Sequence, residues 1–386
     1  MRIGIEGQRL FRPNKHGMDM VALELIRNLQ ALDCENEYFI FVKPDVDSGV
    51  LHESANVKII PVEGGFYPLW EQFALPKAAQ KYGCDLLHCT SNTAPIWCST
   101  PLMITLHDII YMERGWLEIL RGKGSLYQKF GNVYRRMVVP RILANSKRIV
   151  TVSNFEKERI NEFFKGQLGN RLRAVYNGVS THFKPVVDET ERLRIKTTYH
   201  LPDRYCFFLG NTDPKKNTEG TLKAFSDYRK QTQIDLKLVM IDFDRDSLLA
   251  ILQAIGDTDL LEHIVLTGYV PNTDLPGIYS QCSFFLYTSL RESFGIPMLE
   301  AMACGVPVIT SNTSCMPEIA DDAALLVNPF VPSEITEAMI QLTNDADLRK
   351  ALIDKGIVRA ASFSWKTMAK QVLQLYLEIE REKSKN

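Results

Sequence analysis

The sequence predicts two α/β domains, each built on a parallel β-sheet with helices on both faces. Its 386 residues exceed one ordinary domain of about 150 residues and allow two, or at most three. Two series of short apolar segments alternate with helical patterns, as in βαβ units. Between them, Lys184–Asp203 is charged, contains two prolines and lacks an apolar strand, so we predict a hinge there. A cleft between two such domains is a common place for a ligand.

Each segment of the two series predicts one strand or helix. The first series predicts strands at Arg2–Glu6, Tyr38–Val42, Val57–Ile60, Asp85–His88 and Leu102–Leu106, and helices over Met18–Leu32 and Trp70–Tyr82. The second series predicts strands at Tyr205–Leu209, Leu236–Ile241, Ile264–Thr267, Ser283–Leu286 and Val306–Thr310. The segment Trp365–Glu382 predicts a helix with one buried stripe, made of Met368, Val372, Leu375 and Leu377. Parallel sheets of this kind hold ligands at the carboxyl ends of their strands.

Composition and charge exclude several classes of protein. Hydrophobic residues make up 45% and charged residues 24% of the chain, as in globular proteins and unlike disordered or collagenous ones. The net charge of -1 provides no global field for nucleic acid, so an anionic ligand must be held locally. The sequence shows neither an apolar run of roughly 18 residues nor a signal-peptide core, so we expect a cytoplasmic protein.

The eight cysteines are scattered through apolar segments and form no Cys-x-x-Cys pair. This spacing favours reduced, buried thiols over a disulfide framework or a zinc site. We therefore expect the cysteines to contribute to packing and not to chemistry.

The strongest chemical signal is a pair of glutamates, Glu292 and Glu300, that are eight positions apart. Glu292 lies in a loop that leaves a predicted strand, and Glu300 lies on the helix that this loop enters. Pro297 suits the first turn of that helix, and Gly305 suits its C-terminal cap. The unit is therefore strand, loop, short helix and strand.

The start of this helix is a candidate anion site. The N–H groups of Phe294, Gly295 and Ile296 would point toward the ligand and, with the helix dipole, favour a phosphate. The two carboxylates would repel a phosphate in contact, so they suit sugar hydroxyls on either side of it. By spacing alone, an ordinary capped helix with two solvated glutamates explains the pattern equally well.

The same segment resembles the retaining glycosyltransferases of family 4, which have the two-domain GT-B fold. Glu292-Ser-Phe-Gly-Ile-Pro and Leu299-Glu-Ala-Met-Ala-Cys-Gly-Val-Pro-Val are similar to the E-x7-E signature of that family. The resemblance implies that Glu292 contacts the donor sugar and Glu300 the nucleotide ribose. It also implies two Rossmann-like domains facing a cleft: residues 1–185, with a C-terminal helix at 366–386 packing back toward this domain, and residues 186–365.

A second match to the family lies in Cys206-Phe-Phe-Leu-Gly-Asn-Thr-Asp-Pro-Lys-Lys-Asn217. It resembles the Arg-Lys-Asn element, with Lys215 in the arginine place and Lys216 in the lysine place. Two cations after a strand suit a leaving nucleoside diphosphate that no metal neutralises, although a lysine pair alone is more often a solvated loop. Lys215 offers a point charge instead of arginine's bidentate fork. We expect no metal and no cofactor besides the nucleotide-sugar substrate.

Two Asp-x-Asp motifs carry little weight as metal sites. Asp45–Asp47 lies in a polar loop, and Asp242–Asp244 follows a predicted strand. Leu266-Thr-Gly-Tyr-Val270 is instead similar to the family's nucleotide-base segment. The resemblance implies that the backbone near Gly268 and Val270 faces the base.

The loop Asn14–Met20 resembles the family's Gly-x-Gly-Arg loop, which lies near the diphosphate and the acceptor. Gly17 is retained, but Asp19 stands where a second glycine is usual, and Met20 stands where arginine is common. Near a diphosphate, Asp19 would be repulsive unless it faced the acceptor. This departure weakens the expected phosphate role of the loop.

His107 and Asp108 directly follow the predicted strand Leu102–Leu106. A lone histidine in this position is more often structural than catalytic. The resemblance assigns His107 to the histidine that meets the donor sugar near the reacting carbon, and Asp108 is a candidate to orient its ring.

Residues 113–148 contain nine basic and two acidic residues, interleaved with apolar and aromatic ones. The segment fits two descriptions: an interfacial segment docked on anionic lipid, or an intramolecular helix with a solvated basic face. A lipid-linked acceptor would suit the first. Pro68–Pro76 is similar to a segment of the subgroup that includes bacterial mannosyltransferases, and we expect its Trp70 in the core.

The resemblance, together with these residues, implies a retaining GT-B enzyme that transfers a hexose from a nucleotide-diphosphate sugar to a hydroxyl of a growing bacterial glycan, such as lipopolysaccharide. Retention is implied by the resemblance alone. The likeness to the mannosyltransferase subgroup makes GDP-mannose the preferred donor, and a UDP-sugar is the alternative. The expected partners are the nucleotide sugar, a glycan or lipid-linked glycan, no nucleic acid, and the inner face of the membrane through residues 113–148.

Two other classes of protein compete with this prediction. A sugar-nucleotide 2-epimerase also has two α/β domains, but the Glu292–Glu300 unit together with Lys215 and Lys216 argues for transfer. A non-catalytic nucleotide-sugar-binding protein would retain the cleft. The altered Gly17–Met20 loop is the feature that favours this last alternative.

Overall fold

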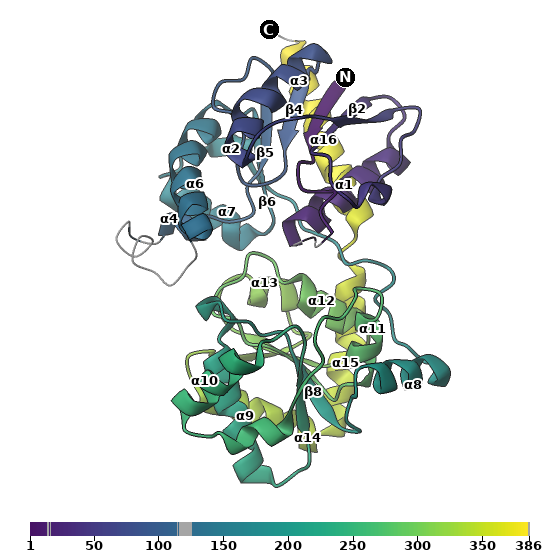
Figure 1. Ribbon diagram of the computed structural model, residues 1–386, viewed down its shortest axis with the longest axis vertical. Coiled ribbons are helices and arrows are strands. Elements are labelled where there is room, and N and C mark those ends of the chain that lie inside the picture. Colours follow the sequence, from purple (N-terminus) through teal and green to yellow (C-terminus); the bar gives the residue numbers. More distant parts are fainter. Residues whose placement is uncertain (14, 16, 114, 116–125, 385–386) are drawn as a thin grey trace. The chain divides into compact units, whose positions relative to one another are not determined.

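The computed structural model describes residues 1–13, 15, 17–113, 115 and 126–384 (Figure 1). The chain forms two compact units, Met1–Asn177 with Trp365–Asn386, and Gly178–Ser364. The division precedes residue 185, the boundary expected from the sequence. Val179 N donates to Phe363 O at 3.2 Å, and the ring of Phe183 packs edge-on against Tyr279. These contacts hold the residues after Asn177 to the second unit.

The described part of the first unit contains one parallel sheet of seven strands, in the order β3-β2-β1-β4-β5-β6-β7. The strands are β1 (Arg2–Glu6), β2 (Glu37–Val42), β3 (Val57–Pro61), β4 (Leu86–Cys89), β5 (Leu102–Thr105), β6 (Arg148–Thr151) and β7 (Leu172–Ala174). The first five confirm the predicted strands. β6 and β7 were not predicted.

One face of this sheet is covered by α3, α6 and α7. The described helical segments of the unit are α1 (Gly17–Leu32), η1 (Ser48–Val50), α2 (Tyr67–Leu69), η2 (Trp70–Ala74), α3 (Leu75–Lys81), α4 (Ile110–Glu113), α6 (Leu126–Asn145), α7 (Asn154–Phe163), η3 (Gly169–Arg171) and α16 (Trp365–Lys383). Trp70 is fully buried on this face, and its Nε1 donates to Val62 O at 2.8 Å. The prediction that Trp70 belongs to the core is confirmed.

The C-terminal helix α16 packs against α1 on the other face of the first sheet (Figure 1). Its buried stripe includes Met368, Val372, Leu375, Tyr376 and Ile379, whereas Leu377 is partly exposed. The prediction of a one-sided helix is confirmed, but its inclusion of Leu377 was wrong, because that position has turned away from the apolar face of the helix.

A buried histidine fastens α16 to the sheet. His88 on β4 contacts Tyr376 OH through Nδ1 at 2.6 Å and Thr105 Oγ1 through Nε2 at 2.8 Å. Burial lowers the pKa of His88 to about 3, so the ring is neutral at physiological pH. The contact joins residues that are 288 positions apart in the sequence.

Replacing Tyr376 by phenylalanine is expected to lower the free energy of unfolding by about 1–3 kcal/mol, because a buried ring nitrogen of His88 loses its partner. Urea unfolding of the full chain at pH 7 measures this change. Tyr269→Phe, at a side chain that is 68% exposed, is the matched control and should change stability by less than about 0.5 kcal/mol. Equal midpoints for the two variants would contradict the anchoring role.

The described part of the second unit contains a parallel sheet of six strands, in the order β10-β9-β8-β11-β12-β13. The strands are β8 (Tyr205–Phe208), β9 (Lys237–Met240), β10 (Ile264–Leu266), β11 (Phe285–Tyr287), β12 (Val308–Ser311) and β13 (Leu325–Val327). All five strands predicted for this unit are present, with shifted ends, and β13 is additional. The prediction of two parallel-sheet α/β domains is confirmed.

The core of the second unit lies between this sheet and α9, α10 and α14. The described helical segments are α8 (Glu189–Thr198), η4 (Pro214–Lys216), α9 (Thr218–Thr232), α10 (Arg245–Ile255), η5 (Asp259–His263), α11 (Leu275–Gln281), α12 (Ile296–Ala303), α13 (Met316–Ala320), α14 (Pro332–Asn344) and α15 (Ala346–Ala361). On the other face, Tyr279 of α11 packs against Phe207 and Phe285.

The predicted hinge is not irregular throughout, because it contains α8. Asp188 caps this helix by accepting from Thr190 N at 3.1 Å. α8 buries Ile195, and its Arg194 lies 2.8 Å from Asp274 at the cap of α11. A helix with a single buried residue leaves almost no periodic apolar pattern in the sequence.

All eight cysteines are free thiols. Cys34 is exposed, and Cys98 and Cys282 are half-buried, so the expectation that the cysteines are buried was wrong at these positions. None of the described helices is both long and apolar enough to cross a membrane.

Candidate functional site

Lys215 and Lys216 end η4, a short turn that follows β8. Asp213 caps the turn, since its Oδ1 accepts from Lys215 N at 3.1 Å. Asn217 closes it in the left-handed conformation with φ 55°, and its Nδ2 donates to Thr288 O at 3.1 Å. The turn is therefore held at the carboxyl end of the second sheet, against the loop that follows β11.

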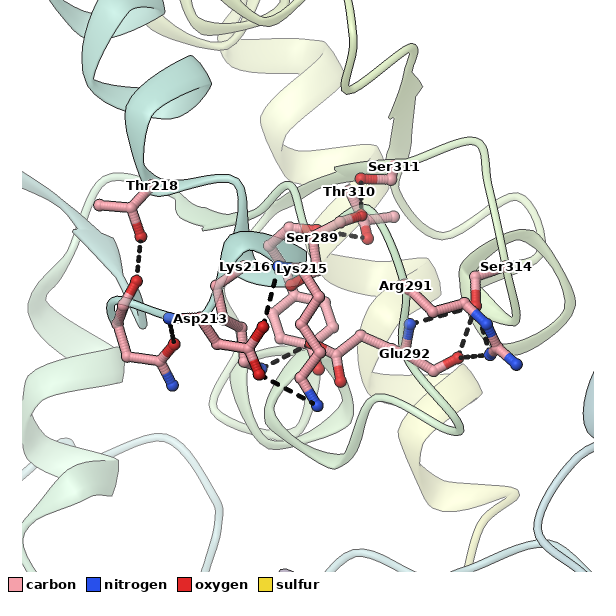
Figure 2. Close-up of polar contacts among 12 residues, drawn as sticks. Asp213, Lys215, Lys216, Thr218, Ser289, Arg291, Glu292, Thr310, Ser311 and Ser314 are labelled. Carbon is pink, nitrogen blue, oxygen red and sulfur yellow. Dashed lines mark hydrogen bonds and ion pairs between the residues drawn. The ribbon is translucent and has the colours of Figure 1, made fainter. Parts of the chain in front are cut away.

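This turn brings together two residues that the sequence assigned separately to the site. Lys216 Nζ lies 2.6 Å from Glu292 Oε1, and the two side chains are only 17% and 13% exposed (Figure 2). The ammonium also lies 5.4 Å from the ring centroid of Tyr287, whose hydroxyl is hydrogen-bonded to Glu292. The pair is thus largely shielded from water, where Coulomb interactions are stronger than at the surface.

The backbone of Glu292 is held by a serine from another loop. Ser314 Oγ accepts from Glu292 N at 3.1 Å and donates to Glu292 O at 2.5 Å (Figure 2). Arg291 Nη1 donates to the same carbonyl at 3.0 Å. Sequence reasoning missed Ser314, because a lone serine after β12 carries no signal. Asp213 did carry a signal in the sequence, because an aspartate followed by proline often begins a helical turn.

The helix α12 begins as the sequence predicts. Gly295 caps it with φ 97°, in the region that favours glycine, and Pro297 occupies its first turn. Ile296 is the first helical residue, so its amide and that of Gly295 precede the intrahelical hydrogen bonds. The side chain of Phe294 is buried, with its ring packed edge-on against Phe363. Only the backbone at Phe294 is therefore suited to a ligand.

Glu300 lies on α12, half-buried, and accepts from Tyr279 OH at 3.3 Å through Oε2. Burial raises the pKa of Glu300 to about 7, against an ordinary value of 4.5. A carboxyl group that titrates near neutral pH is common at functional sites. Its charge state would decide whether it accepts hydrogen bonds with both oxygens.

The predicted base segment follows β10. Gly268 has φ 71°, and its carbonyl accepts from Asp242 N at 2.9 Å. Val270 is buried, whereas the intervening Tyr269 is 68% exposed. The carbonyl of Gly268 therefore already accepts a hydrogen bond from a residue of the second unit.

One aspartate of each Asp-x-Asp motif has a structural partner. Asp244 caps α10 by accepting from Ser247 N at 2.8 Å, and Asp47 is paired with Lys15. Within the described ranges, no group of three or more His, Cys, Asp or Glu side chains is arranged to hold a metal ion.

His107 lies in the first unit, just beyond β5, and is 5% exposed. Its Nε2 lies 3.0 Å from Thr90 O, and its backbone amide donates to Asn92 Oδ1 at 2.6 Å. Since a carbonyl only accepts, this geometry assigns the ring hydrogen to Nε2. Burial lowers the pKa of His107, so Nδ1 of the neutral ring is an acceptor. Asp108 accepts from Ile110 N at 3.1 Å through Oδ1.

Gly17 is the first residue of α1 in the same unit. Among the described residues, a Cβ at this position would meet no atom within 4 Å, so local packing does not require glycine. Residues 114 and 116–125 of the predicted membrane segment 113–148 lie outside the described residues. Its described part includes α6, which buries Val138 and Ile142 in the core and exposes Arg141.

Two family models match the chain over most of its length. Residues 16–183 match "Glycosyltransferase Family 4", and residues 189–359 match "Glycosyl transferases group 1". The chain belongs to the group 1 glycosyltransferases of family 4. These matches confirm the family membership that was predicted from the motif between Glu292 and Val308.

A curated relative and two solved structures agree with this family. The "O-antigen chain mannosyltransferase B" of Escherichia coli is 31% identical over 237 residues, which span 61% of each chain. A sucrose-phosphate synthase from Thermosynechococcus elongatus has a TM-score of 0.74 at 19% identity, with 99% of both chains covered. Anabaena HepE in complex with UDP and glucose has a TM-score of 0.71 at 15% identity, covering 97% of this chain and 99% of that one. These structures confirm the GT-B fold.

Proposed function

We propose that this chain is a retaining hexosyltransferase that moves mannose from GDP-mannose to a hydroxyl of a growing bacterial glycan. The observation that carries the proposal is the shielded pair of Lys216 and Glu292, 2.6 Å apart beside the start of α12. A cation and a carboxylate that acts as hydroxyl acceptor, next to a helix N-terminus, suit the diphosphate and the sugar of one donor. The E. coli mannosyltransferase supports the choice of mannose.

In the proposed mechanism, the bond between the anomeric carbon and the diphosphate oxygen breaks through an oxocarbenium-like transition state. Lys216, Lys215 and the amides before α12 stabilise the charge that develops on the departing diphosphate. Glu292 and His107 hold the sugar, and Glu300 accepts from the ribose hydroxyls. The acceptor oxygen attacks the same face, and its proton passes to the leaving phosphate. Lys216 has three donors, so it can contact Glu292 and a phosphate together.

A UDP-sugar donor is the second candidate. It is favoured by HepE, a protein of the same fold that was solved with UDP and glucose. A nucleotide-sugar-binding protein without transfer is a third, favoured by Asp19 and Met20 in the Gly17 loop. The GDP and UDP donors differ in their bases. In our proposal the backbone near Gly268 and Val270 contacts the base, so comparing the binding of GDP with that of UDP distinguishes the two candidates.

We further propose that the acceptor is lipid-linked and that the chain works at the inner face of the membrane, touching it through residues 113–148. The excess of basic residues in that segment and the exposed Arg141 support an anionic lipid surface. Sedimentation with vesicles of phosphatidylglycerol, compared with phosphatidylcholine, tests this contact. Equal binding to both kinds of vesicle would reject it.

Thermal unfolding with a panel of nucleoside diphosphates tests the donor site directly. A ligand at 100 times its Kd adds about 2.7 kcal/mol of stability, which shifts the midpoint measurably. We expect GDP to stabilise the wild type and to have little effect on Lys216→Ala. Lys223→Ala, which removes an exposed lysine from α9, should respond like the wild type. No shift with any nucleotide would overturn the donor-site assignment, and a UDP-selective shift would favour the second candidate.

Transfer is expected to proceed without a divalent metal, because Lys215, Lys216 and the start of α12 neutralise the leaving group in our proposal. Turnover of purified protein in excess EDTA should stay within about twofold of the rate with Mg²⁺. A metal-dependent glycosyltransferase assayed in parallel controls for chelation. Loss of activity in EDTA that Mg²⁺ restores would contradict the proposed diphosphate site.

A further inference from the structure

The turn η2 of the first unit buries a carboxyl group that the proposed mechanism does not use. Glu71, the second residue of this π-helical turn, is 1% exposed. Its Oε2 accepts from Tyr67 OH at 2.6 Å and from Thr93 Oγ1. Its Oε1 accepts from Tyr134 OH at 2.6 Å and from Gln72 Nε2 at 3.0 Å. Two donors to each oxygen hold the carboxyl group in one orientation.

Packing alone does not explain an acid at this position. All four donors to Glu71 are uncharged, and burial raises the pKa of its carboxyl because the charged form loses its hydration. A buried carboxylate without a cationic partner lowers stability, whereas a well-packed apolar side chain does not. π-Helical turns are rare and are often located at functional sites. A role in the reaction would account for both features.

The side chains of Glu71 and Gln72 hold the loop that follows β4, residues 90–96, which we call the β4 loop. Glu71 accepts from one hydroxyl of this loop. Gln72 Nε2 donates to Ala94 O at 3.0 Å, and Gln72 Oε1 accepts from Ile96 N at 2.9 Å. The β4 loop is therefore fixed by three side-chain contacts from η2.

The β4 loop in turn holds His107. Thr90 O lies 3.0 Å from His107 Nε2, and Asn92 Oδ1 accepts from His107 N at 2.6 Å. Asn92 is buried with φ 68°, a left-handed conformation that costs free energy in residues other than glycine and must be held by its surroundings. Thr93, the next residue in the chain, donates to Glu71. The contact from η2 thus lies one residue from the side chain that holds His107.

We propose that Glu71 is a positioning residue for the transfer reaction: through the β4 loop it keeps the ring hydrogen of His107 on Nε2 and leaves Nδ1 as an acceptor. A hydroxyl of the donor sugar donates to that acceptor. The inference rests on the proposed function, in which His107 holds the sugar, and it adds a core residue that controls this histidine. Because Glu71 is buried, it acts on the reaction only through His107.

Steady-state kinetics of the full chain carrying Glu71→Gln tests the proposal. Glutamine keeps the size of the side chain but replaces one oxygen with an NH₂ group, so the donors that face it lose an acceptor. We expect kcat to fall about tenfold and KM for the donor to change less than about threefold, because the orientation of the sugar is disturbed and nucleotide binding is not.

Asp33→Asn is the matched control. Asp33 is a buried carboxyl of the same unit that accepts from Tyr38 OH and from Asn36 Nδ2 at 2.6 Å. It precedes β2, at the amino edge of the sheet, whereas His107 follows the carboxyl end of β5. Asp33→Asn should therefore keep kcat within about twofold of the wild type, even where it lowers the free energy of unfolding.

A double variant separates an effect through His107 from a general loosening of the unit. When Glu71→Gln is added to His107→Gln, kcat should fall by less than about twofold more, whereas independent effects would multiply. Thr93→Val removes the hydroxyl that links Glu71 to the β4 loop and leaves the carboxyl in place. It should reproduce the fall in kcat, and it serves if Glu71→Gln fails to fold.

NMR of nitrogen-labelled histidine rings gives a readout that needs no activity. The His107 signals are identified by their loss in His107→Gln. They should show the ring hydrogen on Nε2 in the wild type and in Asp33→Asn, and a mixture of both tautomers in Glu71→Gln.

Three outcomes would overturn the inference: an unchanged His107 tautomer in Glu71→Gln, a kcat of the folded Glu71→Gln within about twofold of the wild type, or multiplied effects in the double variant. Failure of the proposed function is recognised separately, as a wild type that binds no nucleotide and transfers no sugar. In that case the tautomer comparison would still report whether Glu71 positions His107.

Discussion

The Lys216→Ala variant is expected to lower kcat/KM for the donor by about 10²–10³-fold, the largest effect of any single substitution at this site. The variant removes the cation nearest to Glu292 and leaves a carboxylate that is 13% exposed without its counter-ion. Both changes weaken binding of the diphosphate, because the loss of the lysine removes an attraction and the unpaired carboxylate repels the phosphates. Steady-state kinetics over a range of donor concentrations measures the loss.

A double variant separates this chemical role from a loss of stability. Removing Lys216 alone should destabilise the second unit, because a mostly buried charge then lacks its partner. Lys216→Ala combined with Glu292→Gln should recover most of that stability but none of the activity. If the double variant recovered activity together with stability, the pair would be structural. Lys223→Ala controls for the loss of one positive charge and should keep wild-type kinetics.

The Glu300→Gln variant is expected to bind the nucleoside diphosphate about tenfold more weakly at pH 8 and yet to be more stable than the wild type. An ionised Glu300 accepts from two ribose hydroxyls, whereas glutamine offers one acceptor oxygen and an unsuited NH₂ group. Calorimetric titration of GDP between about pH 5.5 and 8.5, the range in which a group of pKa about 7 titrates, measures the affinity. For the wild type, affinity should fall as the pH drops through about 7, and the variant should be flat.

The stability change has the opposite sign from the binding change. The pKa of Glu300 is raised in the folded chain from 4.5 to about 7, so the folded state binds the proton more tightly than the unfolded state does. The stability contributed by this group is fully present below pH 4.5 and is lost as the pH rises through about 7. Glutamine carries no charge, so the variant should be more stable than the wild type by about 1–2 kcal/mol at pH 8, and the difference should disappear near pH 4.5.

Urea unfolding of both proteins at pH 5 and pH 8, roughly either side of the titration, provides this measurement. Glu337→Gln removes an exposed carboxylate from α14 and serves as the matched control, with no expected change. A Glu300→Gln variant that was destabilised at both pH values would show that the carboxyl has a structural role. Unchanged GDP affinity at pH 8 would remove Glu300 from the nucleotide site.

The strands of both sheets were largely readable from the sequence, because a buried parallel strand is a continuous apolar run. β1 was predicted with its observed ends, and the unit containing Glu292, Gly295 and Glu300 was predicted as strand, loop and helix. Proline and glycine at the two ends of α12 mark the limits of that helix locally. The helix α8 was missed, because its single buried residue, Ile195, produces no periodic pattern.

Contacts between residues that are far apart in the sequence could not be predicted from local sequence patterns. Lys216 and Glu292 are 76 positions apart, and nothing in either segment states that their side chains meet. The same holds for Ser314 and Glu292, which come from loops after different strands. For His107, the sequence offered Asp108 as the nearest candidate partner along the chain, and the structure adds the Thr90 carbonyl, 3.0 Å from Nε2.

The sequence by itself determined the fold class, because apolar periodicity, proline and glycine act over a few residues, and its motifs determined the family. It also supplied the candidate residues for the proposed chemistry. Only the tertiary structure decided how those residues are paired and charged. It places Lys216 beside Glu292, buries Glu300 so that the pKa of this carboxyl is raised to about 7, and pairs Arg9 with Asp19. Burial and the distance between charges set these properties, and both depend on how strands from separate parts of the chain lie side by side.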